Sequence, residues 1–218
     1  MNQIVKTSDG SDTIFVPELN EHYHSIHGAV QESQHIFISN GFNYCNADPI
    51  SIFEVGFGTG LNALLTAIRS RKGSRIVNYT SIEKYPLPVN IALKLNHHQF
   101  AGDGSLEIFK SLHTAPWNSS SEICSNFIIN KIEGDLLDTT LSGMHDLIYF
   151  DAFGPDKQPD MWTHEIFSKI SEITKPEGIL LTYSAKGDVK RNLRACGFEV
   201  KLLPGPPGKR HIIRAIKK

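Results

Sequence analysis

From Ser51 onward, apolar segments of strand-like composition alternate with segments of helical periodicity, and this alternation constrains the fold more than any other feature. Apolar residues within 61–71, for example, recur at a helical spacing between two apolar, β-rich runs. Strands that alternate with helices form a mostly parallel sheet covered on both faces. The sequence therefore predicts an α/β fold.

The expected elements place seven strands in that sheet. Strands are predicted at residues 51–57, 76–83, 127–132, 146–150, 178–183, 198–203 and 211–216. Helices are predicted at residues 61–71, from Pro86 to about Asn96, at 161–173 and at 189–195. The Pro/Gly-rich turn between the last two strands is too short for a parallel crossover, so they should pair as an antiparallel hairpin. A mostly parallel seven-stranded sheet that ends in such a hairpin is typical of the Rossmann-like class I methyltransferase fold.

The chain length of 218 residues suits one domain of this kind, over residues 51–218. Residues 1–50 lie outside the alternating pattern. We expect them to form a small N-terminal extension packed over the ligand edge of the catalytic domain, and a stabilising arm fits them nearly as well. The polar patch at residues 118–121 is expected to be a loop-like insertion.

A glycine loop, residues 56–60, separates the first strand from the first helix. Glycines there let the backbone approach a ligand at the carboxyl edge of the sheet. A dinucleotide loop has the spacing Gly-x-Gly-x-x-Gly, but Gly60 comes one residue early and Leu61 takes the expected position. Glu54 beside the loop would repel a pyrophosphate, whereas it suits the ammonium and sulfonium of S-adenosylmethionine. The loop therefore favours S-adenosylmethionine as the cofactor, bound by Glu54, Gly56, Gly58 and Gly60.

Two more acidic residues stand at successive strand ends. Glu83 ends the second strand, where a carboxylate can accept hydrogen bonds from both ribose hydroxyls. Asp135 follows the third strand and is placed to contact the adenine amino group. We also assign Asn62, Lys84, Leu136 and Asp151 to the same cofactor site.

The segment from Phe150 to Trp162 resembles the methyltransferase domain of the MnmC family, through its Asp-Ala-Phe-Gly-Pro and Gln-Pro-Asp-Met-Trp elements. The resemblance covers most of the chain from about Tyr23 onward. It extends through residues 23–25, Gly28, 32–33, 56–62, 81–87, 182–185, 189–191 and 205–210. It implies that S-adenosylmethionine donates a methyl group to the aminomethyl group of 5-aminomethyl-2-thiouridine at the tRNA wobble position. The implied partner is the tRNA anticodon region.

This chain departs from the family pattern in two places. Some family members carry a C-terminal flavin-dependent oxidase domain that makes the aminomethyl group, and this chain ends before one. It therefore resembles the stand-alone form, for which a separate oxidase is a candidate partner. Lys186 and Asp188 also stand in a stretch that is usually small and apolar in the family.

Asp151 is the candidate catalytic residue, because it ends the central strand beside the expected methyl donor. An alkylamine has a pKa of about 10, so at neutral pH a proton must be accepted or routed away. A carboxylate also stabilises the protonated amine, so Asp151 is equally suited to orient it. Tyr149, Phe150 and Phe153 are candidates for cation–π contact with the sulfonium, although strand alternation makes at least one of them core. Trp162 is expected to pack in the core.

The charge is unevenly distributed along the chain. Residues 184–218 carry ten Lys and Arg against two acidic residues, whereas residues 1–183 carry twelve against twenty-one. The basic end is a candidate polyanion-binding face, and a lysine-rich terminus that protects an edge strand explains it equally well. As substrate-binding residues we choose Tyr23, Phe153, Pro155, Lys157, Lys190, Arg191, Lys209 and Arg210, the basic ones as phosphate contacts.

Other features narrow the class of protein. The ten histidines and three cysteines have no convincing metal-ligand spacing, so we expect no metal, and the cysteines read as reduced thiols of a cytoplasmic protein. We expect neither a signal peptide nor a membrane span. Two alternatives stay open: an aminopropyltransferase of the polyamine-synthase kind, and a non-catalytic cofactor-binding module that associates with RNA. The basic C-terminal stretch argues against the first, and Asp151 with the strand-end carboxylates argues against the second.

Overall fold

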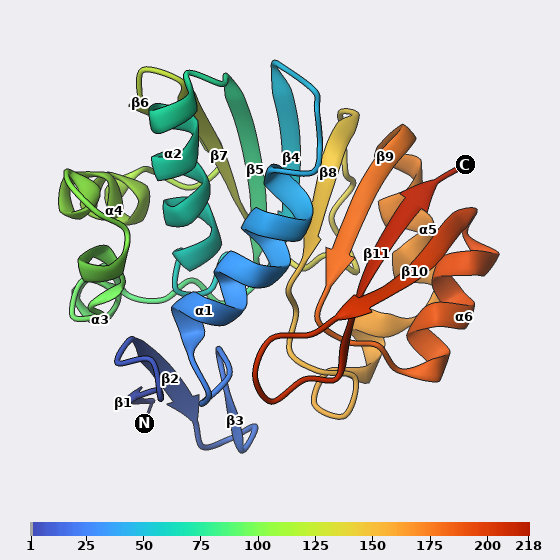
Figure 1. Cartoon of the computed structure of the whole chain (residues 1–218), viewed down its shortest axis with the longest axis horizontal. Coiled ribbons are helices and arrows are strands. Elements are labelled where there is room, and N and C mark those ends of the chain that lie inside the picture. The colour runs from blue at the N-terminus through green and yellow to red at the C-terminus, as the bar shows by residue number, and fades with distance from the viewer. Residues whose placement is uncertain (1) are drawn as a thin grey trace.

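The computed structural model describes residues 2–218 and is organised around an eight-stranded sheet (Figure 1). Its strands are β4 (Ile50–Val55), β5 (Val77–Glu83), β6 (Ser119–Cys124), β7 (Phe127–Glu133), β8 (His145–Phe150), β9 (Thr174–Thr182), β10 (Phe198–Pro204) and β11 (His211–Lys217). They lie in the order β10-β11-β9-β8-β4-β5-β7-β6. The centre of the sheet, from β9 to β7, is parallel throughout.

The predicted antiparallel hairpin is confirmed, since β10 and β11 pair from Phe198↔Lys217 to Pro204↔His211. The last strand inserts between β9 and β10, which leaves β10 at the edge of the sheet. The Rossmann-like fold predicted from the alternating pattern is therefore present, with one strand more than expected.

The additional strand is β6, where the sequence predicted a loop. It pairs antiparallel with β7 at the other edge, from Ser119↔Lys131 to Cys124↔Phe127. Its serines are mostly exposed, and backbone hydrogen bonds to one neighbour are enough to form an edge strand. A polar composition therefore did not exclude a strand here.

Helices cover both faces of the sheet and bury two apolar clusters against it. On one face lie α2 (Leu61–Gly73), α4 (Ser105–Thr114) and α1 (Ala29–Ser33), which the π-type helical turns of residues 34–42 continue. On the other face lie α5 (His164–Glu172) and α6 (Gly187–Ala195). Figure 1 shows these two layers on either side of the strands.

The helix predictions were partly wrong. The helix expected from Pro86 to Asn96 is only α3 (Val89–Ala92), because Pro88 disfavours a helical conformation at the residue before it. The helix expected at residues 161–173 is divided into a 3₁₀ turn, Pro159–Trp162, and α5, which the Thr163 side chain caps. The sequence analysis did not predict α4.

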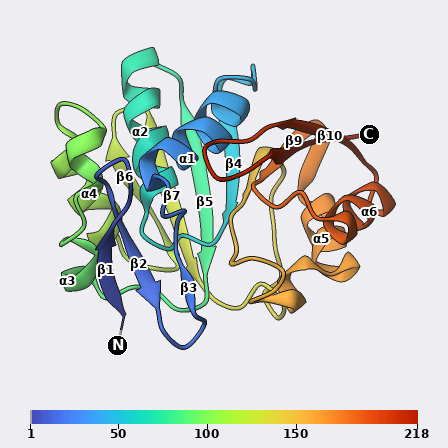
Figure 2. The same ribbon diagram turned by 60° about the horizontal axis from the view of Figure 1, so that its bottom comes forward.

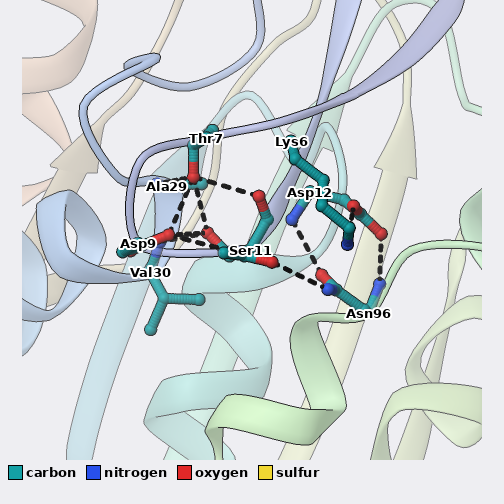
Figure 3. A network of polar contacts seen from close by, with 9 residues as sticks. Lys6, Thr7, Asp9, Ser11, Asp12, Ala29, Val30 and Asn96 are labelled. Carbon is teal, nitrogen blue, oxygen red and sulfur yellow. Dashed lines mark hydrogen bonds and ion pairs between the residues drawn. The ribbon is translucent and has the colours of Figure 1, made fainter.

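The N-terminal extension forms a small antiparallel sheet of β1 (Gln3–Lys6), β2 (Asp12–Val16) and β3 (Glu21–His22). Figures 1 and 2 place it beyond the end of the sheet toward which the β9 arrow points. Asp12 holds it to the rest of the chain through Asn96, with two reciprocal backbone–side-chain hydrogen bonds of 2.7 and 2.9 Å (Figure 3). The Asp9 carboxylate ties the β1–β2 turn to α1 by accepting a hydrogen bond from the Gln31 N–H.

Candidate active site

A cavity of about 630 Å³ lies between the carboxyl ends of the parallel strands and the N-terminal extension. This is the edge where ligands bind in open α/β sheets. Most of the site residues predicted from the sequence line it: Tyr23, Gly56, Gly58, Asn62, Glu83, Lys84, Asp135, Leu136, Asp151, Phe153, Pro155 and Lys209.

The glycine loop needs its glycines for two reasons. Gly56 and Gly58 have positive φ angles, +89° and +49°, which L side chains rarely adopt. A Cβ on Gly56 would lie 2.9 Å from the carbonyl oxygen of Asp151, and one on Gly58 would lie 3.1 Å from the Tyr23 ring. The loop therefore contacts both the end of β8 and the extension.

One side of the cavity, which we call the strand-end wall, is made at the ends of β4, β5 and β7 by Gly56, Gly58, Glu83, Lys84, Asp135 and Leu136. The Glu83 carboxylate accepts the Gly58 N–H at 3.0 Å and the Tyr85 N–H at 2.9 Å, which fixes the glycine loop against β5. Lys84 lies 2.6 Å from Asp135. A hydrogen bond from Lys84 lowers the pKa of the Asp135 carboxyl, so that carboxyl is ionised at neutral pH.

Asp151 stands at the junction of β8 with this wall. The Asn62 side-chain amide donates to Asp151 Oδ2 at 2.8 Å and to Glu54 Oε1 at 3.1 Å. Burial raises the pKa of Asp151 to about 7, and Asn62 lowers it in part. Asp151 is therefore close to half-ionised at neutral pH.

The structure corrects the assignment of Glu54. Its side chain lies beneath the cavity without lining it, 1% exposed, and also accepts a hydrogen bond from Ser81 Oγ at 2.7 Å. Burial raises the pKa of Glu54 to about 8. Glu54 thus positions Asn62 and cannot face a ligand directly. Gly60, the N-cap residue that precedes α2, likewise lies outside the cavity lining.

The other side of the cavity, which we call the assembled wall, brings together distant parts of the chain: Tyr23, Glu32, Phe153, Tyr183 and Lys209. The Tyr23 and Phe153 rings meet edge to face at 5.0 Å. The Tyr183 hydroxyl donates to the Ala152 carbonyl at 2.8 Å, which places this ring beside Asp151. Glu32 and Tyr183 were not predicted as site residues, although both lie in segments that carry the family resemblance.

Several other predicted residues lie away from the cavity. Tyr149 and Phe150 are fully buried in opposite apolar clusters, so the cation–π role considered for them is wrong, whereas Phe153 lines the cavity. Trp162 packs against Phe150 and Phe167, as expected for a core residue. Of the basic residues predicted as phosphate contacts, those outside the cavity lining are Lys157, Lys190, Arg191 and Arg210.

Within residues 2–218, no group of three or more His, Cys, Asp or Glu side chains is arranged to hold a metal ion. His24 instead shares a 2.7 Å hydrogen bond with Thr59 Oγ1 of the glycine loop. In the same part of the chain, no helix is both long and apolar enough to cross a membrane.

The fold is that of Rossmann-like methyltransferases, and the cavity lies at the carboxyl ends of its parallel strands. Residues 119–218 match a family model described as S-adenosyl-L-methionine-dependent methyltransferase, so the cofactor expected from the sequence is confirmed. Among proteins of this fold, the chain is similar to the MnmC proteins, as its motifs predicted. It is 30% identical to the tRNA 5-methylaminomethyl-2-thiouridine biosynthesis bifunctional protein MnmC of Cupriavidus metallidurans over 224 residues, 94% of this chain and 32% of that protein. The chain spans about a third of the length of the curated relatives it matches.

Two solved structures share the fold. MnmC2 from Aquifex aeolicus superposes with a TM-score of 0.78 and 24% identity, over 100% of this chain and 70% of that one. Spermidine synthase from Thermotoga maritima superposes with a TM-score of 0.60 and 12% identity, over 98% of this chain and 72% of that one. The second similarity shows that a polyamine synthase shares this fold, and it does not favour aminopropyl transfer over methyl transfer.

Proposed function

We propose that this chain transfers a methyl group from S-adenosylmethionine to the amine of 5-aminomethyl-2-thiouridine at the wobble position of tRNA. The names of its MnmC relatives concern 5-methylaminomethyl-2-thiouridine, which differs from the aminomethyl base by one methyl group. The single observation that carries the proposal is the position of Asp151, a half-buried carboxyl that Asn62 holds where the two walls of the cavity meet.

The strand-end wall fits S-adenosylmethionine. Glu83 would hold the ribose hydroxyls, while Asp135 and Leu136 would hold the adenine. The side-chain oxygen of Asn62 is buried and accepts no hydrogen bond from residues 2–218, so a ligand donor such as the cofactor ammonium would satisfy it. When bound, S-adenosylmethionine supplies an electrophilic methyl group on a sulfonium.

Asp151 has two tasks in this proposal. The substrate amine arrives largely protonated, because an alkylamine has a pKa of about 10, and its nitrogen must present a free lone pair. The ionised Asp151 first accepts a proton from the ammonium and passes it to solvent. The carboxylate then accepts a hydrogen bond from the neutral amine and orients the lone pair of the nitrogen toward the donor. Asn62 keeps the carboxylate in place throughout.

The assembled wall would receive the base. A wobble nucleotide must leave the anticodon stack to enter a cavity of this kind, and Tyr23 and Phe153 offer aromatic surface beside it. Pro155 lines the same entrance. Phosphate contacts are proposed for the basic residues outside the cavity: Lys157, Lys190, Arg191 and Arg210. Such an enzyme would act in the cytoplasm, after an oxidase has exposed the aminomethyl group.

The test uses labelled S-adenosylmethionine and tRNA from cells blocked at the aminomethyl stage. Label should enter the wobble nucleoside as 5-methylaminomethyl-2-thiouridine, and Asp151→Asn should abolish it. Asp156→Asn, an exposed cavity-rim carboxylate paired with Lys186, is the matched control and should retain activity. Cofactor binding without incorporation would overturn the proposal. Transfer from decarboxylated S-adenosylmethionine to putrescine would support the aminopropyltransferase alternative instead.

A further inference from the structure

The assembled wall already holds an alkylammonium group, that of Lys209. Its Nζ lies 2.5 Å from Glu32 Oε1 and 5.1 Å from the centre of the Tyr183 ring. The Lys209 side chain is 26% exposed and that of Glu32 is 10% exposed. A carboxylate and an aromatic face are the two groups that bind an ammonium best in a partly desolvated place.

Glu32 is held ready for a cation. Its Oε2 accepts the Ser25 N–H at 2.9 Å, which fixes the carboxylate plane. Its Oε1 is buried and accepts no hydrogen bond from any other part of the described chain, so the Lys209 ammonium alone compensates it. A buried carboxylate without a partner is costly, so something positive must occupy this place.

This ammonium lies beside the proposed reaction centre. The Tyr183 hydroxyl bonds to the Ala152 carbonyl, one residue after Asp151. Glu32 raises the pKa of Asp151 and Lys209 lowers it, which shows that both charges act on the Asp151 carboxyl. All four of these side chains line the same cavity.

We propose that Glu32 and the Tyr183 ring form a subsite for an alkylammonium group, which Lys209 occupies in this structure and the aminomethyl group of the substrate occupies during the reaction. The inference rests on the proposed function for the identity of the substrate amine. The two groups are chemically alike, each a primary ammonium on a CH₂. Exchange of one ammonium for the other, before the substrate nitrogen loses its proton, leaves the charge around Glu32 unchanged, so no buried carboxylate is left unpaired as the substrate enters.

Lys209 is placed to leave. It lies on the loop between β10 and β11, where its neighbour Arg210 is exposed. Its long, flexible stem can carry the ammonium to solvent or to a phosphate of the incoming RNA. The other two lysine–carboxylate pairs of the cavity differ, because Lys84 and Lys186 are each nearly half exposed at its rim.

Ethylammonium is the probe for the subsite. Saturating S-adenosylhomocysteine occupies the cofactor site, so that ethylammonium cannot bind there. In Lys209→Met, which keeps the apolar stem, ethylammonium should bind about tenfold more tightly than to the wild type by calorimetry. In Lys209→Met/Glu32→Gln that gain should be lost. Lys201→Met, at an exposed lysine of β10 outside the cavity, is the matched control and should bind as the wild type does.

Methyl transfer then tests the second half of the proposal. In Lys209→Met, ethylammonium should compete with the aminomethyl tRNA, raising KM without changing kcat. Glu32→Gln should raise the KM for that tRNA about tenfold and leave S-adenosylhomocysteine affinity unchanged. The subsite would be overturned if the wild type and Lys209→Met bound ethylammonium equally well, or if the tighter binding persisted in Lys209→Met/Glu32→Gln. Inhibition that is not competitive with the tRNA would also overturn it. A wild-type enzyme that fails to methylate tRNA would instead overturn the proposed function, and the ethylammonium result would still decide whether the subsite exists.

Discussion

The two walls of the cavity are built in opposite ways. The strand-end wall comes from the ends of neighbouring parallel strands, and each of its residues lies within a short motif such as 54–60 or 83–85. The assembled wall collects side chains from the extension, from the segments that follow β8 and β9, and from the β10–β11 loop. In the proposed function, the two walls have different roles: the strand-end wall binds the cofactor, and the assembled wall selects the group that receives the methyl group.

Asp151→Asn changes the residue at which the two walls meet, and it should have the largest effect on the rate of methyl transfer. We expect kcat to fall about a thousandfold, because the amine loses its general base and its orienting carboxylate. The dissociation constant for S-adenosylhomocysteine should change only a few fold in equilibrium titration. A drop confined to cofactor affinity would mean that Asp151 belongs to the strand-end wall alone.

The pH dependence of methyl transfer tests the same residue without changing it. Burial raises the pKa of Asp151 to about 7, and the groups that surround it are Glu54, Glu32, Lys209 and Tyr183. The ionised carboxylate is the active form, so kcat should fall about tenfold for each pH unit below 7. Rates measured from pH 5 to 9 check this, and a profile without a break near 7 would contradict the role given to Asp151.

Glu83→Gln should weaken the strand-end wall selectively. The amide keeps one acceptor for the Gly58 and Tyr85 N–H groups and loses the charge, so we expect cofactor affinity to fall about tenfold to a hundredfold. The KM for tRNA at saturating cofactor should stay within about twofold. Glu133→Gln is the matched control, because Glu133 pairs with Glu83 in the sheet register but is exposed and outside the cavity.

Phe153→Ala should weaken the assembled wall selectively and by less. Loss of one aromatic surface beside the entering base should raise the KM for tRNA about tenfold. Cofactor affinity, measured by calorimetry, should be unchanged. Phe100→Ala removes a partly exposed phenylalanine outside the cavity and serves as the control. If Phe153→Ala lowered cofactor affinity and tRNA affinity equally, the assignment of cofactor and tRNA to different walls would be wrong.

The same contrast explains what the sequence could predict. The glycine loop, Glu83 and Asp135 were found because a parallel sheet brings successive strand ends to one edge, so spacing along the chain predicts closeness in space. Glu32 and Lys209 meet only because α1 and the β10–β11 loop both reach the cavity, and no local pattern encodes that contact. Lys209 was therefore predicted as a phosphate contact and found in a cavity wall.

Some local predictions were wrong because composition is a weak guide to edge elements. The serine-rich β6 needs only one neighbour and little burial, so its sequence carries no strand pattern. Glu54 was assigned to the ligand because an acidic residue before a glycine loop suggests contact. On a strand, however, side chains alternate in direction, and that of Glu54 points toward Asn62 and Ser81.

The pairing of Glu32 with Lys209 also has a consequence for how the site is completed. Glu32 and Lys209 lie far apart in the sequence, so the assembled wall exists only after the segment that joins them has been synthesised. The residues of the strand-end wall emerge much earlier. The strand-end wall is therefore synthesised in full before the residue that completes the Glu32–Lys209 pair is available.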